Sequence, residues 1–398
     1  MLFFLLGFSF SSFALEKTAV LPKGIRNLSY KQISATIKEK FNSDGSRSLL
    51  LEKPVTFQNL IDKKSGLSKK LAEAFFRNHF KLTDKVGSLR ANMAANVKVH
   101  VPLFSYGLTE NLTLAMAVPY YDANVHFSQL VFDGDNRQKL IDLLKGEEAN
   151  QVKEAIEAED KFNHVVSDLK EKMKNNGYQK LGQWKGKGVG DIVLAAKYRF
   201  YNKEVLKFAS SSGLILPTGR VANPDILNDI PFGTGNAGLF SSLICDQQLS
   251  EKILINEYVK ITKYFSSEKE VRLVTDAETI AVPKNKVKFQ TGNKFETGLS
   301  GQFETNFGLI GGLGYVHESK LKDFYDLNKN PEVKGKLEKE TDSSTNHIIA
   351  KVGYSSVPAF KRKQLPLPAI ASLEYRKQFL SANAKAKDLL TLDFSVFF

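Results

Sequence analysis

Residues 88–104 read SLRANMAANVKVHVPLF, and their alternation decides the fold. The odd-numbered residues from Leu89 to Leu103 are all apolar, whereas the even-numbered ones include Arg90, Asn92, Asn96, Lys98 and His100. A strict period of two over this length predicts a β-strand with one apolar face and one wet face. A strand of about 9 to 11 residues already crosses a bilayer at the tilt of a barrel strand, so this one is long enough to cross and project.

Segments of the same kind recur along the chain. Alternating apolar residues favour strands over 25–41, 88–104, 112–120, 192–200, 206–217, 236–248, 253–265, 286–304, 307–317, 346–354, 367–378 and 389–398. The total of about twelve is even, as in bacterial outer-membrane barrels. The predicted fold class is therefore all-β, a transmembrane antiparallel β-barrel of about 12 strands.

The lengths of the connections support this prediction independently. Short joins near residues 106–111, 202–205, 248–252 and 304–307 alternate with long ones at 42–87, 131–188, 218–235, 266–285 and 319–345. Outer-membrane barrels pair short periplasmic turns with long outer loops in this way. Both ends of the chain then fall on the periplasmic side. The last two joins are exceptions, because 356–366 is long for a turn and 380–384 is short for a loop.

Two long connections carry helix signals. In 131–188, Leu169 and Met173 continue an apolar spacing of three to four residues, which ends before Asn175-Asn176-Gly177. In 42–87, LSKKLAEAFFRNHF at 67–80 predicts a second short helix. We expect helical insertions in the extracellular loops at about 42–87 and 131–188, with apolar faces that cover the barrel mouth or each other; the alternative is that they bind a partner.

Residues 1–14, MLFFLLGFSFSSFA, have the apolar stretch and small final residues of a secretory signal. The alternative is a buried hydrophobic strand or helix. With a cleaved signal, residues 15–398 form a single barrel domain, and the expected location is the outer membrane of a Gram-negative bacterium. The single cysteine, Cys245, cannot form an intramolecular disulfide, and barrel closure can replace crosslinks because it satisfies the backbone groups of every strand.

The chain carries 56 Lys and Arg against 43 Asp and Glu, a net charge of +13. It lacks the basic helices, zinc spacings and aromatic motifs of nucleic-acid binders, so no nucleic-acid partner is predicted. Outer-membrane lipid and lipopolysaccharide, whose phosphates are anionic, are the expected partners of the basic surface.

The wet rows of the predicted strands supply the candidate lumen residues. A charge facing lipid costs about 2–4 kcal/mol near the midplane, so strand parity assigns charged rows to the lumen. They either brace the lumen by pairing across it or form a charged passage for small solutes. The predicted lumen-lining residues are Arg90, Lys98, His100, Lys197, Arg199, Lys288, Lys294, Glu296, His347, Lys351, Glu374 and Arg376.

The sequence contains few indications of a catalytic, metal-binding or phosphate-binding site. The six histidines are far apart and none has metal-site spacing, so no metal, cofactor or catalytic residue is predicted. A hydrolase using His100 or His347 is the least favoured alternative. The glycines of GKGVGD at 186–191 are not followed by a helix, which indicates close backbone packing rather than a phosphate loop.

The closing stretch LLTLDFSVFF, residues 389–398, places Phe394, Val396 and Phe398 on an apolar row. A terminal aromatic after such a row resembles the signal that outer-membrane proteins present to the barrel assembly machinery. We expect this strand to close the barrel against the first strand, near 25–41.

Four stretches together resemble one family. They are LFSYGLTENLTLAMAVPYY at 103–121, GVGDIVLAAKYRFY at 188–201, GLILPTGR at 213–220 and LEYRKQFLSANAKAKDLLTLDFSVFF at 373–398. This order is similar to the meta-pathway phenol-degradation protein family of outer-membrane barrels, itself similar in kind to long-chain fatty acid transporter barrels. The resemblance implies passage of small hydrophobic or aromatic compounds, and the large insert at 131–188 departs from the family.

The expected function is an outer-membrane channel or transporter for small hydrophobic molecules, working by diffusion and without enzymatic chemistry. The main alternative is a non-transporting adhesin or receptor that binds a partner through its long loops.

Overall fold

The protein is described from a computed structural model, which covers residues 16–56, 81, 83–133, 164, 166–273, 283–328 and 330–398. No helix within these ranges is both long and apolar enough to cross a membrane. The predicted secretory signal at 1–14 and the predicted helix at 67–80 lie outside the described residues.

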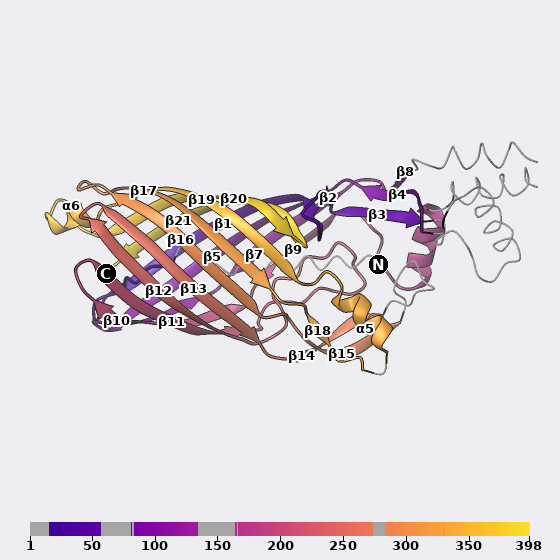
Figure 1. The fold of residues 1–398 in the computed structure, drawn as a ribbon, viewed down its shortest axis with the longest axis horizontal. Coiled ribbons are helices and arrows are strands. Elements are labelled where there is room, and N and C mark those ends of the chain that lie inside the picture. The colour runs from indigo at the N-terminus through magenta and orange to yellow at the C-terminus, as the bar shows by residue number, and fades with distance from the viewer. Residues whose placement is uncertain are drawn as a thin grey trace, which may run out of the picture.

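Strands at twelve positions close into an antiparallel barrel, which confirms the predicted fold class (Figure 1). Closure occurs because the first strand pairs with the last strand on one side and with β5 on the other, as the closing stretch predicted. Around the barrel the strands are β1 (Arg26–Phe41), β5 (Met93–Thr109), β6 (Leu112–Ala117) continued by β7 (Tyr120–Phe127), β9 (Trp184–Val189) continued by β10 (Ile192–Asn202), β11 (Leu206–Leu216), β12 (Gly238–Ser250), β13 (Ile253–Tyr264), β16 (Lys294–Glu304), β17 (Leu309–Lys320), β19 (Ser343–Ser355), β20 (Ala369–Ala382) and β21 (Ala384–Phe397).

The connections segregate by length. The short turns after β5, β10, β12 and β16 lie at one end of the barrel, with α6 (Val357–Lys361) and the C-terminus, at the left of Figure 1. We call this the turn end, and the opposite one the loop end. Arg26 and Phe398 exchange two backbone hydrogen bonds, of 2.7 and 3.0 Å, at the turn end, so the seam of the barrel is complete there.

Two small sheets stand at the loop end, outside the barrel wall. One contains β3 (Leu51–Thr56), β4 (Lys85–Ala91) and β8 (Val131–Asp133). Nearby, β2 (Arg47–Leu49) pairs antiparallel with the last residues of β1. Helical residues 166–175 pack Leu169 and Met173 onto Leu51 and Leu89 of this sheet. The second sheet contains β14 (Ser267–Arg272), β15 (Lys284–Gln290) and β18 (Phe324–Tyr325), covered by α5 (Pro331–Glu338).

The outward rows form an apolar band, as expected for the lipid-facing surface of a transmembrane barrel. On β10, β16 and β21 the rows follow the parity that the sequence predicted, with the charged residues on the opposite, inward side. Exposed members of these rows include Leu194, Tyr198, Phe295, Leu299, Phe303, Leu390, Leu392 and Phe394.

On β5 the predicted parity is wrong. Val97, Val99 and Val101 are at most 1% exposed and pack inside the barrel, so Lys98 and His100 face outward. The ring nitrogen Nδ1 of His100 is 2.5 Å from the hydroxyl of Tyr30, which is outward on β1. The loop-end part of this long strand has a polar outer face and an apolar packed inner face, the reverse of a lipid-facing segment.

Arg90 and Lys288 are also misplaced by the prediction. The segment 88–104 divides at Asn92 into β4 and β5, and 286–304 divides into β15 and β16, so both residues belong to the outer sheets. Arg90 forms ion pairs with Glu52 and Asp133, at 3.1 and 2.9 Å, on the small sheet. Alternation continues through both breaks, and therefore it could not reveal that the chain leaves the wall.

Candidate functional site

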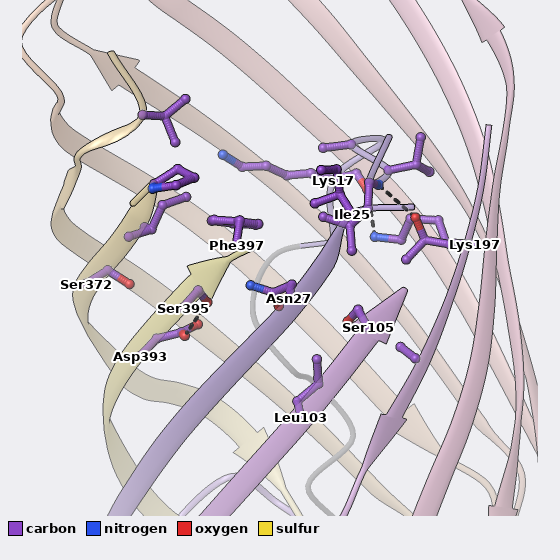
Figure 2. Close-up of a pocket in the computed structure, with 18 of the residues that line it drawn as sticks. Lys17, Ile25, Asn27, Leu103, Ser105, Lys197, Ser372, Asp393, Ser395 and Phe397 are labelled. Carbon is purple, nitrogen blue, oxygen red and sulfur yellow. Dashed lines mark hydrogen bonds between the residues drawn. The ribbon is translucent and has the colours of Figure 1, made fainter. Parts of the chain in front are cut away.

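A cavity of about 900 Å³ occupies the turn-end half of the lumen (Figure 2). We call it the vestibule. Its wall comes from strands all around the barrel, and α6 and the chain end lie at its mouth. Apolar side chains make up much of the lining, among them Leu103, Ala115, Val193, Ala195, Phe240, Ile310, Phe360 and Phe397.

Residues 16–25, here called the N-terminal segment, run inside the barrel and form one side of the vestibule. Gly24 donates a backbone hydrogen bond of 2.8 Å to the carbonyl of Gly107 on β5. A Cβ atom at Gly107 would lie 2.0 Å from the carbonyl oxygen of Pro22, so glycine is required for the close approach of the segment to the wall.

Buried polar contacts hold the tip of the N-terminal segment. The carboxylate of Asp246, on β12, accepts hydrogen bonds from the backbone nitrogen and the hydroxyl of Thr18, at 3.0 and 2.6 Å. Glu16 lies 3.0 Å from Nζ of Lys260 on β13 and accepts a 2.7 Å hydrogen bond from Ser242. Thr18 is 1% exposed and Asp246 5%, so solvent competes little for these bonds.

Lysine side chains converge on the same level of the vestibule. Nζ of Lys197 donates to the carbonyl oxygen of Lys17 at 2.8 Å, and Figure 2 shows the two residues side by side. Nζ of Lys17 donates to the side-chain oxygen of Gln302. Burial lowers the pKa of Lys17 to about 8, and the ammonium groups of Lys351 and Lys197 add to this effect, whereas the carboxylates of Asp246 and Glu304 oppose it.

A second segment, the inward loop (residues 217–237), enters the lumen from the loop end. Ile230 and Phe232 are at most 1% exposed and pack against the inner faces of β5 and β7. Cβ atoms at Gly186 and Gly188 would both lie 3.2 Å from the ring of Phe232, so these glycines of the GKGVGD motif provide close packing, as predicted. Arg220 stabilises the loop through its 2.5 Å ion pair with Asp229.

Asp191 fastens both ends of the inward loop. It lies between β9 and β10, and its carboxylate accepts backbone hydrogen bonds from Gly219 at 3.0 Å and from Thr234 at 2.8 Å. The hydroxyl of Thr234 adds a third bond at 3.2 Å. These three donors stabilise the ionised form of the carboxylate.

The substitution Asp191→Ala is expected to release the inward loop. It removes three hydrogen bonds to a charged acceptor and should cost about 3 kcal/mol of loop attachment. Trypsin added to intact cells should then cleave after Arg220, which the folded loop protects. The control is Asp122→Ala, which removes an outward carboxylate paired with the exposed Lys187. Equal protection of Arg220 in both variants would show that Asp191 does not hold the loop.

The structure places eight of the predicted lumen residues on inward rows, and Lys197 and Lys351 among them line the vestibule. Others contact side chains on the same strand or on the adjacent strand. Nε of Arg376 donates to Glu374 at 2.6 Å, and the hydroxyl of Tyr258 donates to Glu296 at 2.6 Å. The eight are Lys197, Arg199, Lys294, Glu296, His347, Lys351, Glu374 and Arg376. Contact with a solute stays a prediction for all of them.

Neither histidine of the hydrolase hypothesis has a catalytic setting. His100 faces outward, and His347 is buried on β19, where its Nε2 has no hydrogen-bond partner among the described residues. Within the described ranges no cluster of three or more histidine, cysteine or acidic side chains could hold a metal ion.

The sequence prediction missed the residues that hold the two lumen segments, above all Thr18, Asp191 and Asp246. Asp246 could have been found, because it lies on the inward row of its strand. The position of residues 16–25 had no signal, since a short segment before the first strand has no periodicity.

No family model matches the sequence, and no curated protein does. Among solved structures, an outer-membrane channel from Pseudomonas putida F1 is similar, with a TM-score of 0.54 and 13% identity over 96% of this chain and 98% of that one. The toluene transporter TodX from Pseudomonas putida gives a TM-score of 0.35 at 10% identity, over 95% and 89% of the two chains. At these identities the likeness to the P. putida F1 channel concerns the fold, and membership of the meta-pathway family stays a prediction.

Proposed function

We propose that the protein is an outer-membrane channel through which small, largely apolar molecules reach the periplasm by diffusion. The observation that carries this proposal is the vestibule, a cavity of about 900 Å³ inside the barrel with a largely apolar lining. Ligand sites in proteins are concave and mostly apolar with a few polar groups, and pockets of this size hold small organic molecules. The name of the similar P. putida F1 structure, an outer-membrane channel, supports the same function.

Access in this mechanism depends on the two segments within the lumen. The inward loop packs on the apolar inner wall at the loop end, and the N-terminal segment lies beside the vestibule. A solute entering from outside has to displace the inward loop or pass beside it, and it then meets the vestibule. No covalent step is involved.

Dye entry into cells tests the proposal. An apolar fluorescent dye that an intact outer membrane excludes should enter cells that express the protein several-fold faster than vector cells. The substitution Ala195→Trp places a large ring in the vestibule and should bring entry close to the vector rate. Ala196→Trp is the matched control, because its neighbouring side chain points outward on the same strand.

The outcomes separate the two main functions. Dye entry at the vector rate, with the protein folded in the outer membrane, would contradict the channel and favour a surface receptor. Equal loss of entry in both tryptophan variants would show that the vestibule is not the route.

A further inference from the structure

The lining of the vestibule is asymmetric in charge. Six lysines contribute to it, whereas the acidic side chains in the lining are Glu16 and Asp393. The lysines come from the N-terminal segment, from four different strands and from α6, so the excess surrounds the cavity. They are Lys17, Lys31, Lys197, Lys260, Lys351 and Lys361.

Two of these ammonium groups are neutralised within the protein. Lys31 lies 3.1 Å from the carboxylate of Asp393, and Lys260 lies 3.0 Å from Glu16. Both acidic residues of the lining are thereby occupied. Asp246 accepts hydrogen bonds from the neutral side chains of Thr18 and Asn256, and its charge acts on both Lys17 and Lys197.

Three of the four remaining lysines, Lys17, Lys197 and Lys351, have weaker partners. Lys197 donates to a backbone carbonyl and Lys17 to the amide of Gln302, both of which are neutral acceptors. Lys351 forms no direct hydrogen bond or ion pair with the part of the chain that the structure describes, but it lies opposite Glu374 on β20, and the carboxylates of Glu374 and Asp393 both attract it. The three ammonium groups are close enough to influence one another, because the charges of Lys351 and Lys197 both act on Lys17.

The positive charge is compensated only in part, because Asp246 and Glu304 offset some but not all of the desolvation of Lys17, and desolvation of an ammonium group in a mostly apolar cavity is costly. Burial is the main cause of the lowered pKa of Lys17, and the repulsion of Lys351 and Lys197 adds to it. A solute with one negative group would compensate more of this positive charge, and the surrounding Val193, Ala195 and Phe240 would cover the apolar remainder of that solute.

We propose that the vestibule selects amphiphilic anions, which are small apolar molecules with a single carboxylate, sulfonate or phosphate group that contacts Lys17, Lys197 and Lys351. The inference rests on the proposed function, because it names the substrate class of the same cavity. Neutral hydrocarbons would still fit the apolar wall but would add no negative charge beside the ammonium groups.

Three aromatic probes of similar size and different charge test the inference. They are benzenesulfonate, benzyl alcohol and benzyltrimethylammonium, titrated by calorimetry into the full barrel in lipid nanodiscs, with empty nanodiscs subtracted. We expect benzenesulfonate to bind about tenfold more tightly than the cation, and its advantage to shrink in 1 M salt, where charges are screened beyond about 3 Å.

Variants assign the effect to the lysines. Lys351→Gln and Lys197→Gln should each weaken benzenesulfonate binding several-fold more than they weaken benzyl alcohol binding. Lys263→Gln is the matched control, because Lys263 is exposed on the outward row of β13. Benzenesulfonate affinity should also fall as the pH rises from 7 to 9.5, since Lys17 loses its proton there, and Lys17→Gln should reduce this dependence.

The possible failures are distinct. Equal affinity for benzenesulfonate and benzyl alcohol, or unchanged binding in the lysine variants, would overturn the anion preference and leave an apolar channel standing. Preferential binding of the cation would overturn it as well. Absence of binding by all three probes would overturn both the inference and the proposed use of the vestibule.

Discussion

Deletion of residues 16–23 is expected to raise the single-channel conductance of the purified protein several-fold. The N-terminal segment lies inside the lumen and forms one side of the vestibule, so its removal clears space that no strand can refill. Gly24 remains and keeps its hydrogen bond to Gly107, and β1 is unchanged, so the barrel wall is intact. Recording in planar bilayers measures the change directly.

Two further variants test whether the N-terminal segment obstructs the lumen. Replacing residues 16–23 by a glycine-serine stretch of equal length preserves the chain but removes the bonds of Glu16 and Thr18, so conductance should rise and fluctuate. Asp246→Ala removes both hydrogen bonds to Thr18 and should have a smaller effect in the same direction. A deletion variant that folds, as shown by heat-modifiable migration, but conducts like the intact protein would show that the segment does not obstruct the lumen.

Deletion of Phe398 is expected to remove most of the folded protein from the outer membrane. Phe398 exchanges two backbone hydrogen bonds with Arg26, at the point where β21 meets β1. Phe398 is 54% exposed and comes after the outward row of Phe394 and Val396, at the mouth of the vestibule. Loss of this residue therefore affects both the seam and the predicted assembly signal.

The heat-modifiable band in outer-membrane fractions measures this effect. Phe303→Ala provides the control, because Phe303 is an outward aromatic of the same band on β16, away from the seam. Its loss should cost little folded protein. Normal levels of the barrel without Phe398 would contradict the assembly role.

The lumen residues show how far alternation can predict a site. Parity placed Lys197 and Lys351 on inward rows because, within the apolar band, lipid outside and polar groups inside leave a strand one stable orientation. It failed at Lys98 and His100, where the inner face is a packed apolar core. Alternation reports that two faces differ, and it does not report which face is inside.

The period-two pattern was sufficient for the all-β fold, the number of strands, the ends at which turns and loops lie, and the pairing of the last strand with the first. These features depend on local alternation and on chain order, both of which the sequence contains. The contents of the lumen were decided by tertiary structure alone. The N-terminal segment and the inward loop are irregular and are held by contacts such as Thr18 with Asp246 and Thr234 with Asp191, between residues far apart in the chain. Such contacts have no sequence period, because their partners meet only after the barrel has closed.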